Sequence, residues 1–168
     1  KRLIDLNSGN DRGRIYRIAP EGFQARGMTG PGEATTAELV QLLGHANGWH
    51  RDTASRLLHA RRDRAAIPGL ERLAGEGGNP RGQLHALWAL WDLRALRLGH
   101  LEGAAASGEP GLRENVARLL GQWWAEEGTA GAAAPGVMAR LLGDPHPRVR
   151  FQAALVLARV GLAVDWSW

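Results

Sequence analysis

Apolar residues recur with helical spacing over most of the chain from Thr35 onward. They stand at positions i, i+3, i+4 and i+7, which share one face of an α-helix. Glycine, proline and Asn-Gly pairs interrupt the pattern at short intervals and are typical of turns. A helix start is indicated at Thr35, because Glu38 follows at the spacing of a capping box. The pattern predicts helices near residues 35–43, 49–62, 66–74, 81–95, 99–106, 112–126, 133–142 and 148–160.

The longer helices share one register. Ala54, Leu84, Val116 and Ala153 are each followed at +3 and +4 by an apolar pair, and these four anchors lie 30, 32 and 37 residues apart. A period in the thirties with two helices per unit is typical of an α-solenoid, in which one hairpin cannot bury its apolar face alone and neighbours stack. We therefore expect an all-α fold, an α-solenoid of about four helical hairpins with a continuous core. The apolar pairs are Leu57/Leu58, Leu87/Trp88, Leu119/Leu120 and Val156/Leu157.

Residues 1–23 differ from the rest of the chain. The segment 14–18 alternates apolar and polar residues between turn-forming stretches, and residues 3–6 offer a partner strand. Because an isolated hairpin is marginal in water, we expect residues 1–23 to be the end of a truncated β domain. Residues 24–34 are rich in glycine and predict a linker, which leaves 35–168 for the solenoid. The chain begins with Lys1, and we expect it to be a segment of a longer protein.

The segment from Asp144 to Arg150, Asp-Pro-His-Pro-Arg-Val-Arg, is followed by the pair Ala153-Ala154 and by Leu157. It resembles the HEAT repeat, in particular the short variant of phycobilisome-lyase-like proteins. In such repeats an aspartate ends the turn between repeats, and an arginine of the next helix pairs along a ladder. The resemblance implies this ladder role for Asp144 and Arg150, and HEAT-like units for the solenoid.

A narrower resemblance involves residues 10–18, 35–40, 47–58 and 83–90. They are similar to large bacterial membrane-bound dehydrogenases with a PVC-type haem-binding domain. In that family a β-propeller comes first, HEAT repeats follow, and a c-type cytochrome domain with a Cys-x-x-Cys-His motif closes the chain. The resemblance implies that this segment joins propeller and solenoid, that haem c is bound elsewhere in the parent protein, and that the parent lies in the periplasm or cell envelope.

Little in the sequence favours catalysis by the segment itself. The absence of cysteine excludes disulfides, thiolate zinc sites, covalent haem attachment and cysteine nucleophiles from these residues. No stretch reaches the roughly 18 consecutive apolar residues of a membrane-spanning helix. Neither Ser55 nor Ser107 has a neighbour that suggests a Ser-His-Asp triad. An enzyme of the bilin-lyase kind is favoured only by the repeat variant, and we expect a non-catalytic scaffold or protein-interaction module without a cofactor of its own.

Histidines and tryptophans have structural interpretations. His85 falls beside an apolar stripe, where a buried imidazole bound to a carbonyl is expected. Haem or metal ligation by His50 or His85 is disfavoured, because no second ligand has suitable spacing. We expect Asn47 to cap the second helix and Trp49 to pack as a hydrophobic staple. The tryptophans predicted to be in the core are Trp88, Trp91 and Trp123.

The formal net charge is +4, and Lys1 is the single lysine among the 21 basic residues. Arginine-rich usage of this kind is typical of GC-rich genomes and solvated helix faces, or else indicates an anionic partner. Arg61, Arg62 and Arg64 cluster at one turn and motivate the alternative, a basic HEAT-like nucleic-acid-binding solenoid similar in architecture to the alkylpurine DNA glycosylases. We favour a protein partner or neighbouring domains. The candidates for the interaction face are His50, Arg51, Arg61, Arg62 and Arg148.

Overall fold

The structure is a computed structural model that describes residues 18–24, 31–127 and 134–159. Within these residues the regular structure consists of eight α-helices and two short 3-10 helices, with no strand, so the prediction of an all-α fold is confirmed. The 3-10 helices are η1 (Pro31–Glu33) and η2 (Arg64–Ala66). The α-helices are α1 (Thr36–Leu42), α2 (Gly48–Arg61), α3 (Ile67–Gly75), α4 (Pro80–Asp92), α5 (Leu98–Ala105), α6 (Pro110–Glu127), α7 (Ala134–Leu142) and α8 (Pro147–Arg159).

Local chemistry fixes where the helices start. Thr35 and Glu38 form the predicted capping box at α1, and the Asn47 side chain accepts a hydrogen bond from the Trp49 amide at the start of α2. Asn79 caps α4 in a similar way, through the amide of Gly82. Three of the longer helices, α4, α6 and α8, begin with proline, which is favoured there because its ring presets a helical φ and its missing N–H has no partner to lose.

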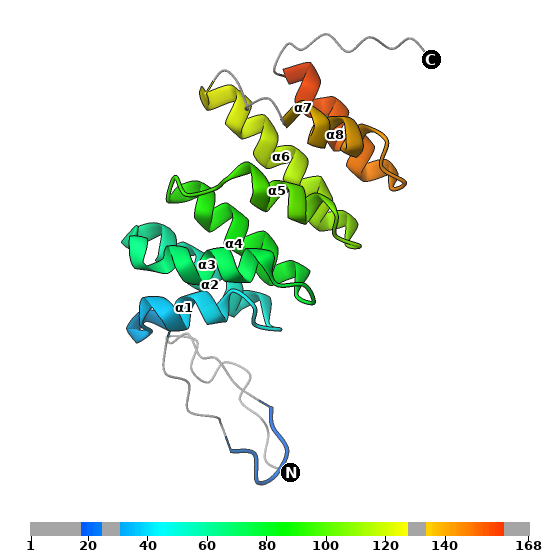
Figure 1. The fold of residues 1–168 in the computed structure, drawn as a ribbon. Coiled ribbons are helices and arrows are strands. Elements are labelled where there is room, and N and C mark those ends of the chain that lie inside the picture. Colours follow the sequence, from blue (N-terminus) through cyan, green and yellow to red (C-terminus); the bar gives the residue numbers. More distant parts are fainter. Residues whose placement is uncertain (1–17, 25–30, 128–133, 160–168) are drawn as a thin grey trace, which may run out of the picture.

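The helices pack as four successive pairs arranged in a row (Figure 1). The two helices of each pair contact each other, as α1 does α2, α3 does α4, α5 does α6 and α7 does α8. Each even-numbered helix also packs on the next even-numbered one, and each odd-numbered helix on the next odd-numbered one. The result is two layers of helices, with the core between them running through every pair.

The core contains the stripe predicted from the sequence. Ala54, Val116 and Ala153 are fully buried, and so is Leu120 at the +4 position. Leu84 and the tryptophans Trp88, Trp91 and Trp123 are partly buried and pack against this core. Helices α6 and α8 approach each other closely at Gly121 of α6, where an added Cβ would stand 2.8 Å from Cγ1 of Val156 on α8.

The predicted β-hairpin falls largely on residues 1–17, which lie outside the described residues. Residues 31–33, predicted as linker, form η1, which packs against α2. The prediction that Trp49 acts as a staple is wrong, because its side chain is 55% exposed. Trp49 precedes Ala54 by five residues, which places it about 140° around the helix from the buried stripe.

No helix within the described ranges is both long and apolar enough to cross a membrane.

Candidate functional site

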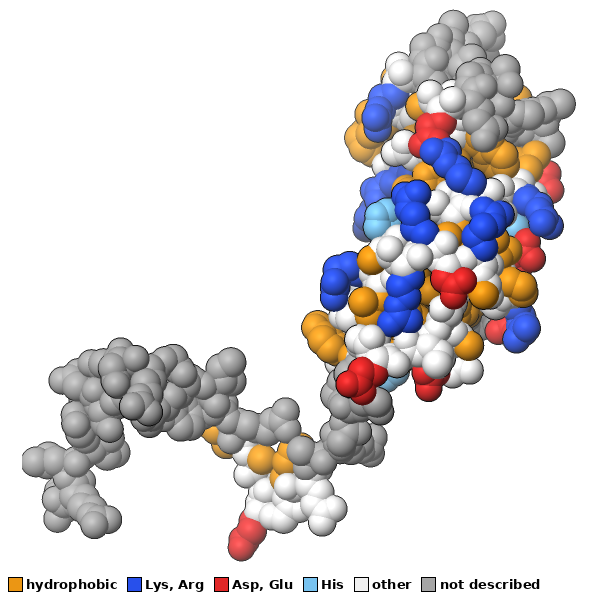
Figure 2. Space-filling model, turned by 90° about the vertical axis from the view of Figure 1, so that its left-hand side faces the viewer, with side chains coloured by type: hydrophobic (Ala, Val, Ile, Leu, Met, Phe, Trp, Pro, Cys, Tyr) orange, Lys and Arg blue, Asp and Glu red, His pale blue; other side chains and the backbone are white. Residues whose placement is uncertain are grey.

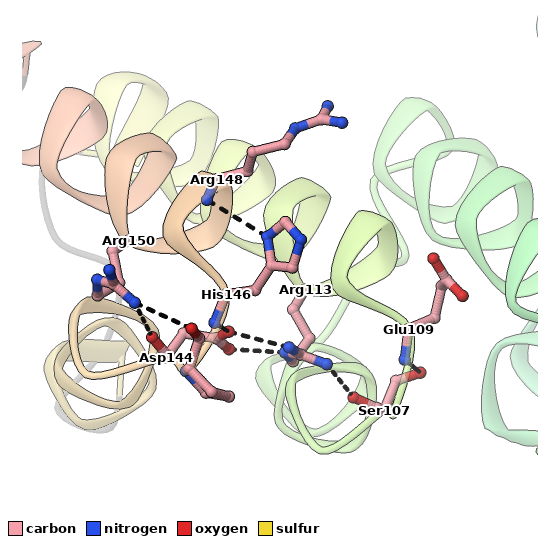
Figure 3. Close-up of polar contacts among 8 residues, drawn as sticks. Ser107, Glu109, Arg113, Asp144, His146, Arg148 and Arg150 are labelled. Carbon is pink, nitrogen blue, oxygen red and sulfur yellow. Dashed lines mark hydrogen bonds and ion pairs between the residues drawn. The ribbon is translucent and has the colours of Figure 1, made fainter.

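The predicted ladder residue Asp144 lies in the turn between α7 and α8 and is 5% exposed (Figure 3). Its carboxylate accepts hydrogen bonds from Nε and Nη2 of Arg113 on α6, at 2.6 and 2.9 Å, and from the backbone amide of His146 at 2.8 Å. The bonds from Arg113 lower the pKa of Asp144 below its ordinary value, against the opposing effect of burial. This buried, bidentate ion pair connects the third helix pair (α5 and α6) to the fourth (α7 and α8).

Arg150 does not bind the carboxylate of Asp144. Its Nη1 donates to the backbone carbonyls of Asp144 at 2.8 Å and Pro145 at 3.1 Å (Figure 3). Arg113 likewise donates through Nη1 to the carbonyl of Ser107, at 2.7 Å. In both cases the acceptor lies six residues before the arginine. Arg113 and Arg150 are each the fourth residue of an even-numbered helix. An alignment of these helix starts in the sequence could therefore have identified Arg113 as a residue equivalent to Arg150.

Arg51 occupies the same position in α2. Its Nη1 donates to the carbonyls of His45, at 2.7 Å, and Ala46, at 2.8 Å. His50 beside it is half-buried, with its ring centroid 4.3 Å from that of His45 and 5.0 Å from that of Trp49. These contacts hold the turn before α2 together, so Arg51 is engaged within the fold.

The five predicted interaction residues do not form one surface. His50 and Arg51 are at the start of α2, and Arg61 and Arg62 are at its end. A helix of 14 residues is about 20 Å long. Arg148 lies on α8, in the fourth helix pair.

Two arginines of the basic cluster at the end of α2 are engaged in hydrogen bonds to backbone carbonyls within the chain. Arg61 donates to the carbonyls of Ala34 at 2.6 Å and Gly32 at 3.1 Å, and Arg64 donates to the carbonyl of Leu93 at 3.0 Å. On the face drawn in Figure 2, arginine side chains are spread along the stack with acidic side chains between them. Phosphate binding, which calls for clustered basic residues, is therefore not favoured on this face.

The structure brings together a Ser-His-Asp group that sequence reasoning missed. Ser55 Oγ lies 2.8 Å from His85 Nδ1, and Asp52 Oδ1 lies 3.9 Å from His85 Nε2. Burial lowers the pKa of His85, which favours its neutral form. The Asp52 side chain is 77% exposed and outside hydrogen-bond distance, and Ser55 is inside a helix whose amides are bonded to helix carbonyls. The Ser55–His85 contact therefore connects α2 to α4, and Asp52 does not complete a hydrogen-bonded triad.

Metal ligation finds no support in the part of the chain that the structure describes. No group of three or more histidine and carboxylate side chains there has the arrangement of a metal site. His59 Nδ1 lies 2.8 Å from Asp92 Oδ2, which is another link between α2 and α4.

The even-numbered helices α4, α6 and α8 carry a groove with two recesses. One has a volume of about 340 Å³ and the other about 590 Å³, both within the range of small-ligand pockets. They share Arg118, which places them side by side. The smaller recess is lined chiefly by Trp88, Arg118, Gln122, Gln152, Leu155 and Arg159. The larger is lined chiefly by Arg81, Leu84, Glu114, Asn115, Arg118 and Arg148.

Ion pairs and hydrogen bonds order this groove. The buried carboxylate of Glu114 is bound by Nη2 of Arg118, at 2.6 Å, and by Nη2 of Arg148, at 3.0 Å. The indole Nε1 of Trp88 donates to Asn115 Oδ1 at 3.3 Å. Arg148 is thus the one predicted interaction residue that lines the groove, whereas sequence periodicity gave no sign of the groove itself.

Comparison of the chain with protein-family models, with curated proteins and with solved structures gave no match.

Proposed function

We propose that the chain is a HEAT-like α-solenoid of about four hairpins that acts as a non-catalytic scaffold and protein-interaction module. The observation that carries the proposal is the packing of each even-numbered helix on the next even-numbered helix and of each odd-numbered helix on the next odd-numbered one. A stack of this kind exposes long helical faces, and it is extended by repetition, not closed around one pocket. Such faces suit contact with proteins or neighbouring domains.

The parent protein in this proposal is a dehydrogenase in which a β-propeller precedes the solenoid and a c-type cytochrome domain follows it. The support is the resemblance of residues 10–18, 35–40, 47–58 and 83–90 to that family. The solenoid would hold the two redox domains at a fixed separation in the periplasm or cell envelope. Haem c would bind the cytochrome domain, since residues 1–168 contain no cysteine for its attachment.

The open reading frame around residues 1–168 tests the parentage. We expect propeller repeats upstream and a Cys-x-x-Cys-His motif downstream, and a frame with neither refutes the family assignment but leaves the solenoid intact. The scaffold role is tested by calorimetric titration of the 168-residue chain with the upstream and downstream segments, each expressed separately. Saturable binding of either segment is expected, and no heat of binding from both contradicts the role.

A further inference from the structure

We propose that the groove on α4, α6 and α8 binds an extended acidic peptide segment of a partner protein, with carboxylates on the arginines and an apolar side chain in the smaller recess. This inference rests on the proposed interaction function and names its surface and its partner chemistry. It is carried by the charge, shape and internal contacts of the groove.

The charge of the groove favours a carboxylate-bearing partner. Its two recesses are lined by Arg81, Arg118, Arg148 and Arg159, against only two carboxylates, Glu109 and Glu114. Glu114 is already neutralised, because its two oxygens are bound by Arg118 and Arg148. Neither Arg81 nor Arg159, both exposed, takes part in an ion pair with another described residue. The groove thus presents guanidinium groups that bind carboxylates through paired hydrogen bonds.

The apolar part of the groove favours a peptide over a nucleic acid. Leu155 is 43% exposed in the smaller recess, where it can contact an apolar side chain. The Trp88 indole N–H is engaged with Asn115, which fixes the ring beside this recess. Gln122 and Gln152 add amide groups to the same lining, and such groups can donate to and accept from a peptide backbone. A phosphate backbone would use the arginines but not Leu155.

The groove is also preorganised. Glu114 holds Arg118 and Arg148 from α6 and α8 in place, at 2.6 and 3.0 Å. A partner carboxylate that approaches these guanidinium groups meets donors that are already positioned, which lowers the entropic cost of binding.

The experiment is a fluorescence-anisotropy titration of the whole chain with a labelled peptide of alternating glutamate and leucine. A peptide of alternating glutamine and leucine is the matched probe. The variants are Arg118→Gln, Arg159→Gln and Leu155→Gln in the groove, with Arg140→Gln as the control. Arg140 is an exposed arginine on α7 and makes no ion pair with another described residue. Far-UV circular dichroism verifies that each variant is folded.

We expect the glutamate peptide to bind with a dissociation constant that rises with salt, and the glutamine peptide to bind at least about tenfold more weakly. Each groove variant should weaken binding of the glutamate peptide by about tenfold, while Arg140→Gln leaves it unchanged. Equal binding of the two peptides, or equal losses in Arg140→Gln and Arg159→Gln, overturns the proposal. The proposal is also overturned if single-stranded poly-dT displaces the peptide from the wild-type chain and the Leu155→Gln variant binds poly-dT as tightly as the wild type does. If the peptide fails but the neighbouring segments still bind, the scaffold role stands and only this groove assignment is lost.

Discussion

Replacement of Asp144 by alanine leaves the guanidinium of Arg113 in a site where only 11% of its side chain is exposed, without the carboxylate that neutralises it. Removal of one partner from a buried ion pair costs about 3–5 kcal/mol. The lower end applies here, because Arg113 keeps its bond to the carbonyl of Ser107. We therefore expect Asp144→Ala to lower the free energy of unfolding by about 3 kcal/mol. The measurement is the midpoint of urea unfolding, followed by far-UV circular dichroism.

Arg148→Gln is the matched comparison. It breaks the pair between Arg148, whose side chain is 75% exposed, and Glu114, which is 9% exposed. Because Glu114 keeps its pair with Arg118, the loss should stay near the about 0–1 kcal/mol of exposed pairs. The double variant Arg113→Met with Asp144→Leu should be more stable than Asp144→Ala alone, because no unpaired charge is buried. An unfolding midpoint for Asp144→Ala no lower than that for Arg148→Gln would refute the reasoning.

The same pair predicts a pH dependence. Hydrogen bonds from Arg113 lower the pKa of Asp144 in the folded chain, so the folded state favours the ionised carboxylate more than the unfolded state does. This contribution is fully present above the unfolded pKa of about 3.9 and is lost as the pH falls through the folded pKa. The wild-type chain should therefore lose more stability on acidification below about pH 4 than Asp144→Asn does. Parallel melting temperatures of the two chains across this range would contradict the prediction.

Four further substitutions test the packing and the helix capping, each by the same urea unfolding. Leu120→Ala removes a fully buried side chain and should cost about 2–5 kcal/mol; a loss below about 0.5 kcal/mol, as at surface positions, would show that the stripe is out of register. Gly121→Ala should destabilise the chain by about 1–3 kcal/mol, because its Cβ would stand 2.8 Å from Val156. In Gly103→Ala on α5 the added Cβ meets nothing within 4 Å, so this substitution should stabilise the chain by about 0.5–1 kcal/mol. Stability changes of the same sign in both variants would refute the close approach of α6 and α8. Thr35→Ala removes the capping box of α1 and should cost about 1 kcal/mol, with no change in the midpoint as the contrary result.

The candidate groove was only partly accessible from the sequence. Arg148 could be named because it belongs to the HEAT-like segment, but Arg118 and Arg159 stand among many solvent-facing arginines of the even-numbered helices. A helical periodicity marks the buried face of a helix, and it treats every exposed position alike. Which exposed side chains border one recess depends on how α4, α6 and α8 lie against each other.

The sequence by itself determined the helices of this protein. Their apolar stripes, their turns and their caps at Thr35 and Asn47 are local features, formed by residues within a few positions of one another. Only the tertiary structure decided the partners across helices. Arg113 meets Asp144, 31 residues away, and Ser55 meets His85, 30 residues away. Because the repeat length varies from unit to unit, a constant spacing in the sequence does not identify which residues contact each other. The packing of one helix pair on the next determines these contacts.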